Sequence, residues 1–115
     1  YISEISEKMC FLLEDDGFEI GAAATFGEGR DSIVGCIHPK SILDAIDAII
    51  SSATIPLDAI FISCTSLKCA LIIAIAEAQY GIPVISSNSA IAWDMARLAR
   101  LAMPANEKGL LFQQD

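Results

Sequence analysis

The sequence has few basic residues for its length. Lysine and arginine together number 7 against 15 aspartates and glutamates, which gives a formal net charge of −8. Binding to a nucleic-acid backbone or to an anionic membrane surface requires a basic protein face, so this balance argues against both partners. If the protein binds an anion, the positive potential must come from local groups at the site itself.

The sequence also lacks any cysteine pair at metal-binding or disulfide-like spacing. The four cysteines, at positions 10, 36, 64 and 69, contain no CxxC element, and there is a single histidine, so no metal site is expected. We interpret the thiols as reduced and therefore expect a cytoplasmic protein. The longest apolar run, Cys69–Ala76, is far below the roughly 18 residues of a membrane helix, so no membrane span is expected.

Apolar residues, in contrast, are abundant. They make up 54% of the chain, while charged residues make up 19%, a balance typical of a globular protein. The length of 115 residues suits one domain with one core. We therefore expect a single folded unit over residues 1–115.

The pattern along the chain alternates between helical and strand-like segments. Helices are predicted over 3–16, from Pro39 through Ile50, over 66–80 and over 87–101. Strands are predicted over 18–24, 57–63 and 82–86, with a short closing strand over 109–112. This alternation predicts an α/β fold in which a parallel sheet is flanked by helices, as in a flavodoxin-like lobe.

Two polar clusters follow the two central predicted strands. Ser63–Ser66 reads SCTS, and Ser86–Ser89 reads SSNS. Ligands of open parallel sheets bind beyond the carboxyl ends of the strands, and a helix N-terminus there can hold a carboxylate. The field of such a helix also favours the reactive thiolate, which makes Cys64 the predicted reactive group. The alternative is that these residues are ordinary helix caps and that Cys64 is a small buried apolar residue.

Other thiol chemistries lack their partners in this sequence. A phosphatase-type loop would place arginine six residues after the cysteine, where Ala70 stands. A cysteine protease needs a histidine, and the single one, His38, lies beside Pro39 and is predicted to open a helix. The glycines of 27–29 lack the rest of a dinucleotide fingerprint. Neither nucleotide nor metal is therefore expected as a cofactor, and the three other cysteines are interpreted as structural.

The run from Asp58 to Ala99 resembles the C-terminal half of maleate cis-trans isomerases and arylmalonate decarboxylase-like proteins. These belong to the aspartate/glutamate racemase superfamily. The shared features are a strand ending in SCT, a helix, a GxPV strand ending in SN, and a helix containing a tryptophan. The resemblance implies two similar α/β lobes, an active site between them, and one catalytic cysteine from each lobe. Cys64 matches the second cysteine, so the first is expected on a missing N-terminal lobe.

The resemblance also implies a substrate site around Cys64. Tyr1 falls where these isomerases have a substrate-contacting tyrosine, and Asp31, or else Ser32, falls where many have a carboxylate-binding asparagine. Carboxylate donors are expected at the two predicted helix starts. The full expected set of substrate-binding residues is Tyr1, Asp31, Thr65, Ser66, Ser87 and Asn88.

The implied activity is cofactor-free isomerisation of a small dicarboxylate, of the maleate-to-fumarate type, with Cys64 as the acid/base thiol. One thiolate adds to the double bond, the new single bond rotates, and elimination gives the trans product. Amino-acid racemisation or decarboxylation of a malonate are alternatives within the same superfamily. A non-catalytic small-molecule binding domain is a third. We also expect this chain to be inactive alone, and its exposed inter-lobe face to be apolar and prone to association. The protein is further expected to form a homo-oligomer.

Overall fold

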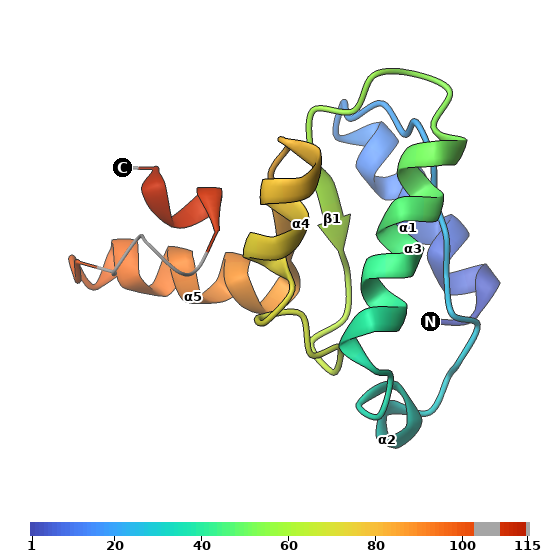
Figure 1. Ribbon diagram of the computed structural model, residues 1–115, viewed down its shortest axis with the longest axis horizontal. Helices are drawn as coiled ribbons and strands as arrows, with labels where there is room; N and C mark the ends of the chain where they lie inside the picture. Colours follow the sequence, from blue (N-terminus) through green and yellow to red (C-terminus); the bar gives the residue numbers. More distant parts are fainter. Residues whose placement is uncertain (103–108, 115) are drawn as a thin grey trace.

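The computed structural model describes residues 1–102 and 109–114 of the chain. Helices surround a small parallel sheet, and β1 lies between α3 and α4 in the view of Figure 1. The elements in chain order are α1 (Ser3–Asp15), α2 (Asp31–Val34), α3 (Pro39–Ser52), β1 (Ile60–Ile62), α4 (Ile73–Tyr80), β2 (Val84–Ser86), α5 (Ser87–Leu98) and the 3₁₀ helix η2 (Leu110–Gln113).

The two described strands pair in parallel, as the alternating pattern predicts. Ile60 lies opposite Val84 and Ile62 opposite Ser86, and α4 makes the crossover between the strands. Both strands consist largely of β-branched and aromatic residues, which suit a half-buried pleated surface. The α/β class is therefore confirmed, and the register brings the carboxyl ends of β1 and β2 to one edge of the sheet.

The core is formed by residues of this sheet and of the helices α3 and α4. Ile42 and Ile46 of α3 are each 2% exposed, and Ala76 of α4 is fully buried. They pack with Ile60 and Val84 of the strands in one hydrophobic cluster. The isoleucines of α3 fall on one helical stripe, so the spacing that predicts the helix also supplies its buried face.

Several helix ends lie where the sequence predicts them. His38 is the N-cap of α3, where its Nδ1 accepts a hydrogen bond from the Lys40 amide at 3.1 Å. Gly17 follows α1 at a φ of 95°, and Gly81 ends α4 at a φ of 72°. Glycine adopts such positive φ angles at little cost, which makes it the usual residue after a helix. The predicted helix-entry role of His38 is thus confirmed.

The predicted strand over 18–24 is wrong. Those residues run without strand structure, and their link to the fold is the Gly21 carbonyl, which accepts hydrogen bonds from the backbone amide and the hydroxyl of Thr54. A ladder needs several successive bonds, whereas this segment lies against a loop. The closing strand over 109–112 is also wrong, because η2 occupies that position. The last long helix ends at Leu98 rather than 101.

The predicted helix over 66–80 begins only at Ile73. Residues between Cys64 and Ile72 instead form successive turns, with the Leu67 amide bonded to the Cys64 carbonyl and the Ile72 amide to the Cys69 carbonyl. These turns bury Leu67 and Cys69, at 7% and 2% exposure. Burial of the two side chains therefore overrides the helical propensity of this segment.

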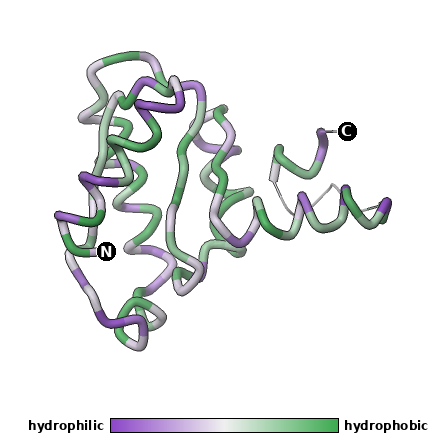
Figure 2. The backbone as a smooth tube through the Cα atoms, turned by 180° about the vertical axis from the view of Figure 1, so that it is seen from behind, coloured by the Kyte–Doolittle hydropathy of each residue, from purple (hydrophilic) through white to green (hydrophobic). Residues whose placement is uncertain are grey.

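Helix α5 projects from the body of the fold (Figures 1 and 2). Ala96 is its single buried residue. Ile91, Met95 and Leu98 recur at helical spacing and are 51%, 65% and 68% exposed. This stripe of α5 is therefore an apolar surface that the described residues leave open. Within that same part of the chain, no helix has the length and apolarity to cross a membrane.

Candidate active site

Cys64 lies just beyond the carboxyl end of β1, in a strained backbone conformation. Its φ is 136°, a value that residues with a side chain rarely adopt. Its backbone N–H donates to the Ser87 Oγ at 3.2 Å, and the residue is 6% exposed. Strain of this kind persists only where the surroundings fix it, and it concentrates at functional sites. The first turn of α5 thus holds Cys64 through Ser87.

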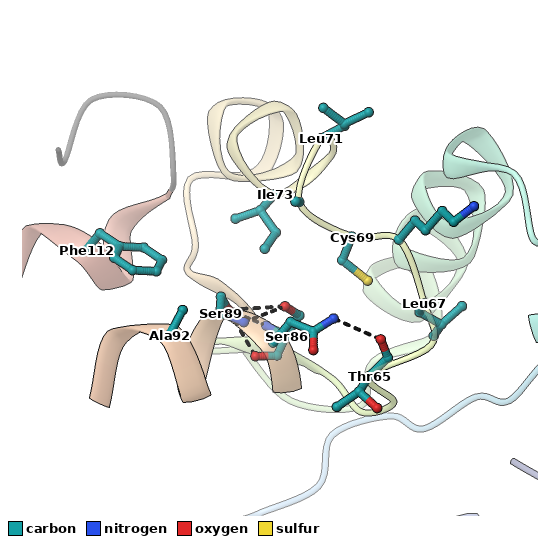
Figure 3. Close-up of a pocket in the computed structure, with 12 residues that line it drawn as sticks. Thr65, Leu67, Cys69, Leu71, Ile73, Ser86, Ser89, Ala92 and Phe112 are labelled. Carbon is teal, nitrogen blue, oxygen red and sulfur yellow. Dashed lines mark hydrogen bonds between the residues drawn. The ribbon is translucent and has the colours of Figure 1, made fainter. Parts of the chain in front are cut away.

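The two polar clusters predicted from the sequence do meet. Besides the bond between Cys64 and Ser87, the Asn88 Nδ2 donates to the Thr65 carbonyl at 2.9 Å. The dashed line that ends at Thr65 in Figure 3 marks this second bond. Both clusters follow parallel strands, so their juxtaposition is a direct result of the sheet topology.

A reciprocal cap fixes the start of α5. Ser86 Oγ accepts from the Ser89 amide at 3.1 Å, while Ser89 Oγ accepts from the Ser86 amide at 2.9 Å. This capping box anchors the first helical turn, whose early N–H groups have no acceptor within the helix. The N-terminus of α5 is therefore a rigid, positively polarised edge beside Cys64.

One part of the sequence-based picture of the site is wrong. Thr65 and Ser66 do not stand at a helix N-terminus, because α4 begins at Ile73 and both residues belong to the intervening turns. The helix start that reaches Cys64 is that of α5. The site therefore has one helix N-terminus rather than two.

A pocket of about 460 Å³ opens next to this site. Thr65, Ser86 and Ser89 lie along one side of it in Figure 3, whereas Leu71 and Ile73 lie on the opposite side and Phe112 closes a third. Cys64 is not among the lining residues, but Thr65 and Asn88 border both places. The pocket is lined by Thr65, Leu67, Lys68, Cys69, Ala70, Leu71, Ile73, Ser86, Asn88, Ser89, Ala92 and Phe112.

Tyr1 and Asp31 lie outside the two polar clusters, before α1 and at the start of α2 respectively. The Tyr1 carbonyl accepts a hydrogen bond from Thr25 Oγ1, and Asp31 opens α2. The end of α2 borders the turn after Cys64, because a Cβ atom on Gly35 would lie 3.9 Å from the Ser66 carbonyl. In the described part of the chain no hydrogen bond joins Tyr1 or Asp31 to Cys64, Ser87 or Asn88.

A close ion pair shapes the loop that leads to Asp31. Both carboxylate oxygens of Glu28 accept hydrogen bonds from the Arg30 guanidinium, at 2.9 and 2.8 Å. The hydrogen bonds from the Arg30 side chain are the main reason that the pKa of Glu28 falls to about 2. Arg30 is the basic residue nearest to Asp31 in the sequence, and its guanidinium is paired with Glu28. In this arrangement Arg30 is therefore not available to bind another anion.

Cys69 is a pocket-wall residue, in addition to the structural role that the sequence predicts for it. Its side chain lies between Leu67 and Ile73 in Figure 3, and the residue is 2% exposed. Burial, and secondarily the electrostatic interaction with Cys64, raise the pKa of the Cys69 thiol to about 11. No signal in the sequence separates Cys69 from an ordinary core cysteine.

We expect Cys69 to resist alkylation at neutral pH. A raised pKa keeps most of the thiol protonated, and only the thiolate reacts, so the labelling rate should be low at neutral pH and should increase with pH up to about 11. The measurement is iodoacetamide labelling followed by peptide mass spectrometry across a pH series. Cys36 is exposed and serves as the control in the same sample. Equal labelling of Cys36 and Cys69 at neutral pH would contradict this expectation.

Among the described residues, no three His, Cys, Asp or Glu side chains gather as a metal site. The chemistry available at this edge consists of a fixed thiol, a helix N-terminus and neutral hydrogen-bond donors. Such a set can bind a carboxylate and move a proton.

Comparison with known proteins gives a consistent picture. Residues 1–112 match the family model of arylmalonate decarboxylase. A maleate isomerase from Nocardia farcinica is 30% identical over 116 residues, covering 100% of this chain and 45% of its own length. The chain therefore spans about half the length of that curated relative.

Solved structures agree. One is the Nocardia farcinica maleate cis-trans isomerase as a cysteine-to-serine mutant with a covalently bound succinylcysteine intermediate; it has a TM-score of 0.87 and 29% identity, covering 100% of this chain and 46% of its own. A glycine-to-cysteine mutant of arylmalonate decarboxylase, in a sulfate-associated form, has a TM-score of 0.79 and 25% identity. That match covers 99% of this chain and 49% of the other.

Proposed function

Because this chain belongs to the arylmalonate decarboxylase family, we propose that it forms one lobe of a cofactor-free, cysteine-dependent isomerase of a small dicarboxylate such as maleate. The observation that carries the proposal is Cys64 itself. The residue lies just beyond a strand of a parallel sheet, is held at a strained φ, and is bonded to the first turn of α5. A ligand site is expected at this edge of such a sheet.

The similar isomerase supports a mechanism with two thiols. Its succinylcysteine is present in a cysteine-to-serine mutant, so the adduct of that enzyme sits on a cysteine other than the replaced one. We assign Cys64 the second, acid/base role in this protein. The nucleophilic thiol would then come from the N-terminal lobe that this chain does not include.

The proposed reaction consists of an addition, a rotation and an elimination. A thiolate of the other lobe forms a C–S bond to one alkene carbon, and the electron pair of the double bond takes a proton from the Cys64 thiol at the other carbon. Rotation about the resulting single bond follows. The Cys64 thiolate then removes the proton, the double bond re-forms in the trans geometry, and the C–S bond breaks to release the nucleophile.

Binding of the carboxylates has to rely on local donors, since the chain carries a net charge of −8. We propose that Ser87 and Asn88 at the start of α5, with Thr65 and Ser66 in the adjoining turn, supply them. A helix N-terminus at a partly buried site contributes up to about 2 kcal/mol, so several donors must act together. Tyr1 would complete the site from the segment that Thr25 holds.

Asp31 favours a second candidate, amino-acid racemisation. An ionised carboxylate accepts hydrogen bonds and does not donate them, so it would repel a substrate carboxylate but would bind an ammonium group. The same two thiols can remove a proton from one face of a substrate carbon and return it to the other. An amino dicarboxylate is therefore the natural substrate of this alternative.

The distinguishing experiment follows the full-length enzyme by NMR in the presence of chelator. Fumarate formed from maleate supports isomerisation. Racemisation of aspartate or glutamate, with maleate unchanged, supports the second candidate, and release of carbon dioxide from phenylmalonate indicates decarboxylation instead. If none of these four substrates reacts, the proposal of a catalytic Cys64 loses its support.

We expect Asn88→Ala to raise KM about tenfold or more, because a hydrogen bond to a charged group is lost, while kcat changes less. The variant also removes the bond to the Thr65 carbonyl, so the turn that adjoins Cys64 loosens. Steady-state kinetics of the full-length enzyme measure both constants. Ser51→Ala, an exposed polar substitution at the end of α3, is the control. An unchanged KM would remove Asn88 from the proposed site.

A further inference from the structure

Glu77 is a buried carboxylate with no part in the chemistry described so far. It lies within α4 and is 8% exposed. Its Oε1 accepts a hydrogen bond from the Val84 amide at 2.9 Å, and its Oε2 accepts one from the Leu110 amide at 2.8 Å. A buried carboxylate is costly unless it is hydrogen-bonded, so these two amides are what stabilise it there.

The two amides belong to segments far apart in the sequence. Val84 is the first residue of β2, and Leu110 is the first residue of η2. A single side chain of α4 therefore joins the strand that leads into the candidate site and the C-terminal 3₁₀ helix. The strand is also held by β1, whereas η2 has no ladder of its own.

Gly109 shows independently that η2 has to approach α4 closely. Its φ is 98°, and a Cβ atom at this position would lie 2.7 Å from Ile73 Cγ2 and 3.1 Å from Glu77 Oε2. Any side chain would force the two segments apart or distort the backbone. The glycine and the carboxylate thus serve the same contact.

The result of this contact is visible in the pocket wall. Phe112, one turn into η2, faces the pocket from the side of Ala92 in Figure 3. Cys69 lines the same pocket, whereas Cys64 does not. If η2 moved away from α4, the pocket would lose its aromatic wall and Cys69 would gain access to solvent.

We propose that Glu77 is a positioning residue that holds η2 against α4 and thereby keeps Phe112 in the wall of the pocket. The role concerns the shape of the pocket and holds whichever reaction the complete enzyme performs. If the proposed isomerisation is wrong, the role of Glu77 can still be correct. If the role of Glu77 is wrong, the assignment of Cys64 is not affected.

The test is hydrogen–deuterium exchange of the full-length protein, read from peptides by mass spectrometry. In E77Q one carboxylate oxygen becomes an NH₂ group facing an amide donor, so residues 109–114 should exchange about tenfold faster or more. G109A should release the same residues with Glu77 intact and leave β2 protected. E14Q, which changes an exposed glutamate of α1, is the matched control.

The alkylation rates of Cys69 and Cys64 distinguish a local release of η2 from a general loosening of the chain. Release of η2 should raise the alkylation rate of Cys69 by about tenfold and leave that of Cys64 within twofold. The proposal is overturned if exchange at 109–114 stays within twofold of the wild type in E77Q. If E77Q loosens the whole chain, G109A decides: selective release of 109–114 supports the proposal, and unchanged exchange there overturns it.

Discussion

Replacing Cys64 with alanine in the full-length protein is expected to lower maleate turnover by about 10²–10⁴-fold, the usual contribution of a positioned acid/base group. The substitution leaves the carboxylate donors in place, so KM should change far less than kcat. NMR integration of fumarate against maleate over time provides the rate. Cys64→Ser should show a comparable loss, because a serine hydroxyl is a much weaker acid than a thiol.

The matched control for this experiment is Cys36→Ala. Cys36 is exposed and lies in the connection after α2, away from the pocket. Cys64 is buried at a strained φ, so its replacement could affect folding. Circular dichroism therefore has to verify that both alanine variants are folded. Full activity in folded Cys64→Ala would exclude a two-thiol mechanism for any substrate.

Residues 1–115 purified alone are expected to show no turnover of maleate. The proposed reaction needs two opposed thiols, and misplacing one catalytic group by about 1 Å already costs about 10²-fold. In the described chain the edge that carries Cys64 faces no second thiol-bearing lobe. The assay compares equal molar amounts of this chain and of the full-length enzyme under the NMR conditions above.

Adding the separately expressed N-terminal lobe is the complementary arm of that experiment. Recovery of fumarate formation in the mixture, and not with a version of that lobe lacking its cysteine, would show that the missing component is the opposing thiol. Turnover by residues 1–115 alone would contradict the two-lobed mechanism directly.

The sequence predicts the elements whose signals are local. The helical stripe of Ile42 and Ile46 identifies α3, and the apolar run before Cys64 identifies β1. The meeting of the SCTS and SSNS clusters is also predictable, because the carboxyl ends of neighbouring parallel strands share one edge. The expectation of a parallel sheet is therefore sufficient to predict that the two clusters form one site, and no information on long-range contacts is needed.

The features that could not be predicted depend on contacts between distant residues. The turns after Cys64 form because Leu67 and Cys69 become buried, which local propensity does not reveal. Residues 18–24 have strand-like composition but meet a loop at Thr54. Phe112 lies in η2, whose Leu110 amide is bonded to Glu77, a residue 33 positions earlier in the chain. Nothing near Glu77 in the sequence distinguishes it from a solvent-facing glutamate.

The open apolar stripe of α5 has a consequence for the colloidal behaviour of this lobe. Ile91, Met95 and Leu98 favour self-association, whereas the net charge of −8 keeps molecules apart. Electrostatic repulsion extends about 30 Å at 0.01 M salt but only about 3 Å at 1 M. At high salt two molecules therefore repel each other only when their surfaces are almost in contact. Raising the ionic strength therefore removes the barrier and leaves the attraction, so the isolated lobe should be easiest to keep dispersed in dilute buffer.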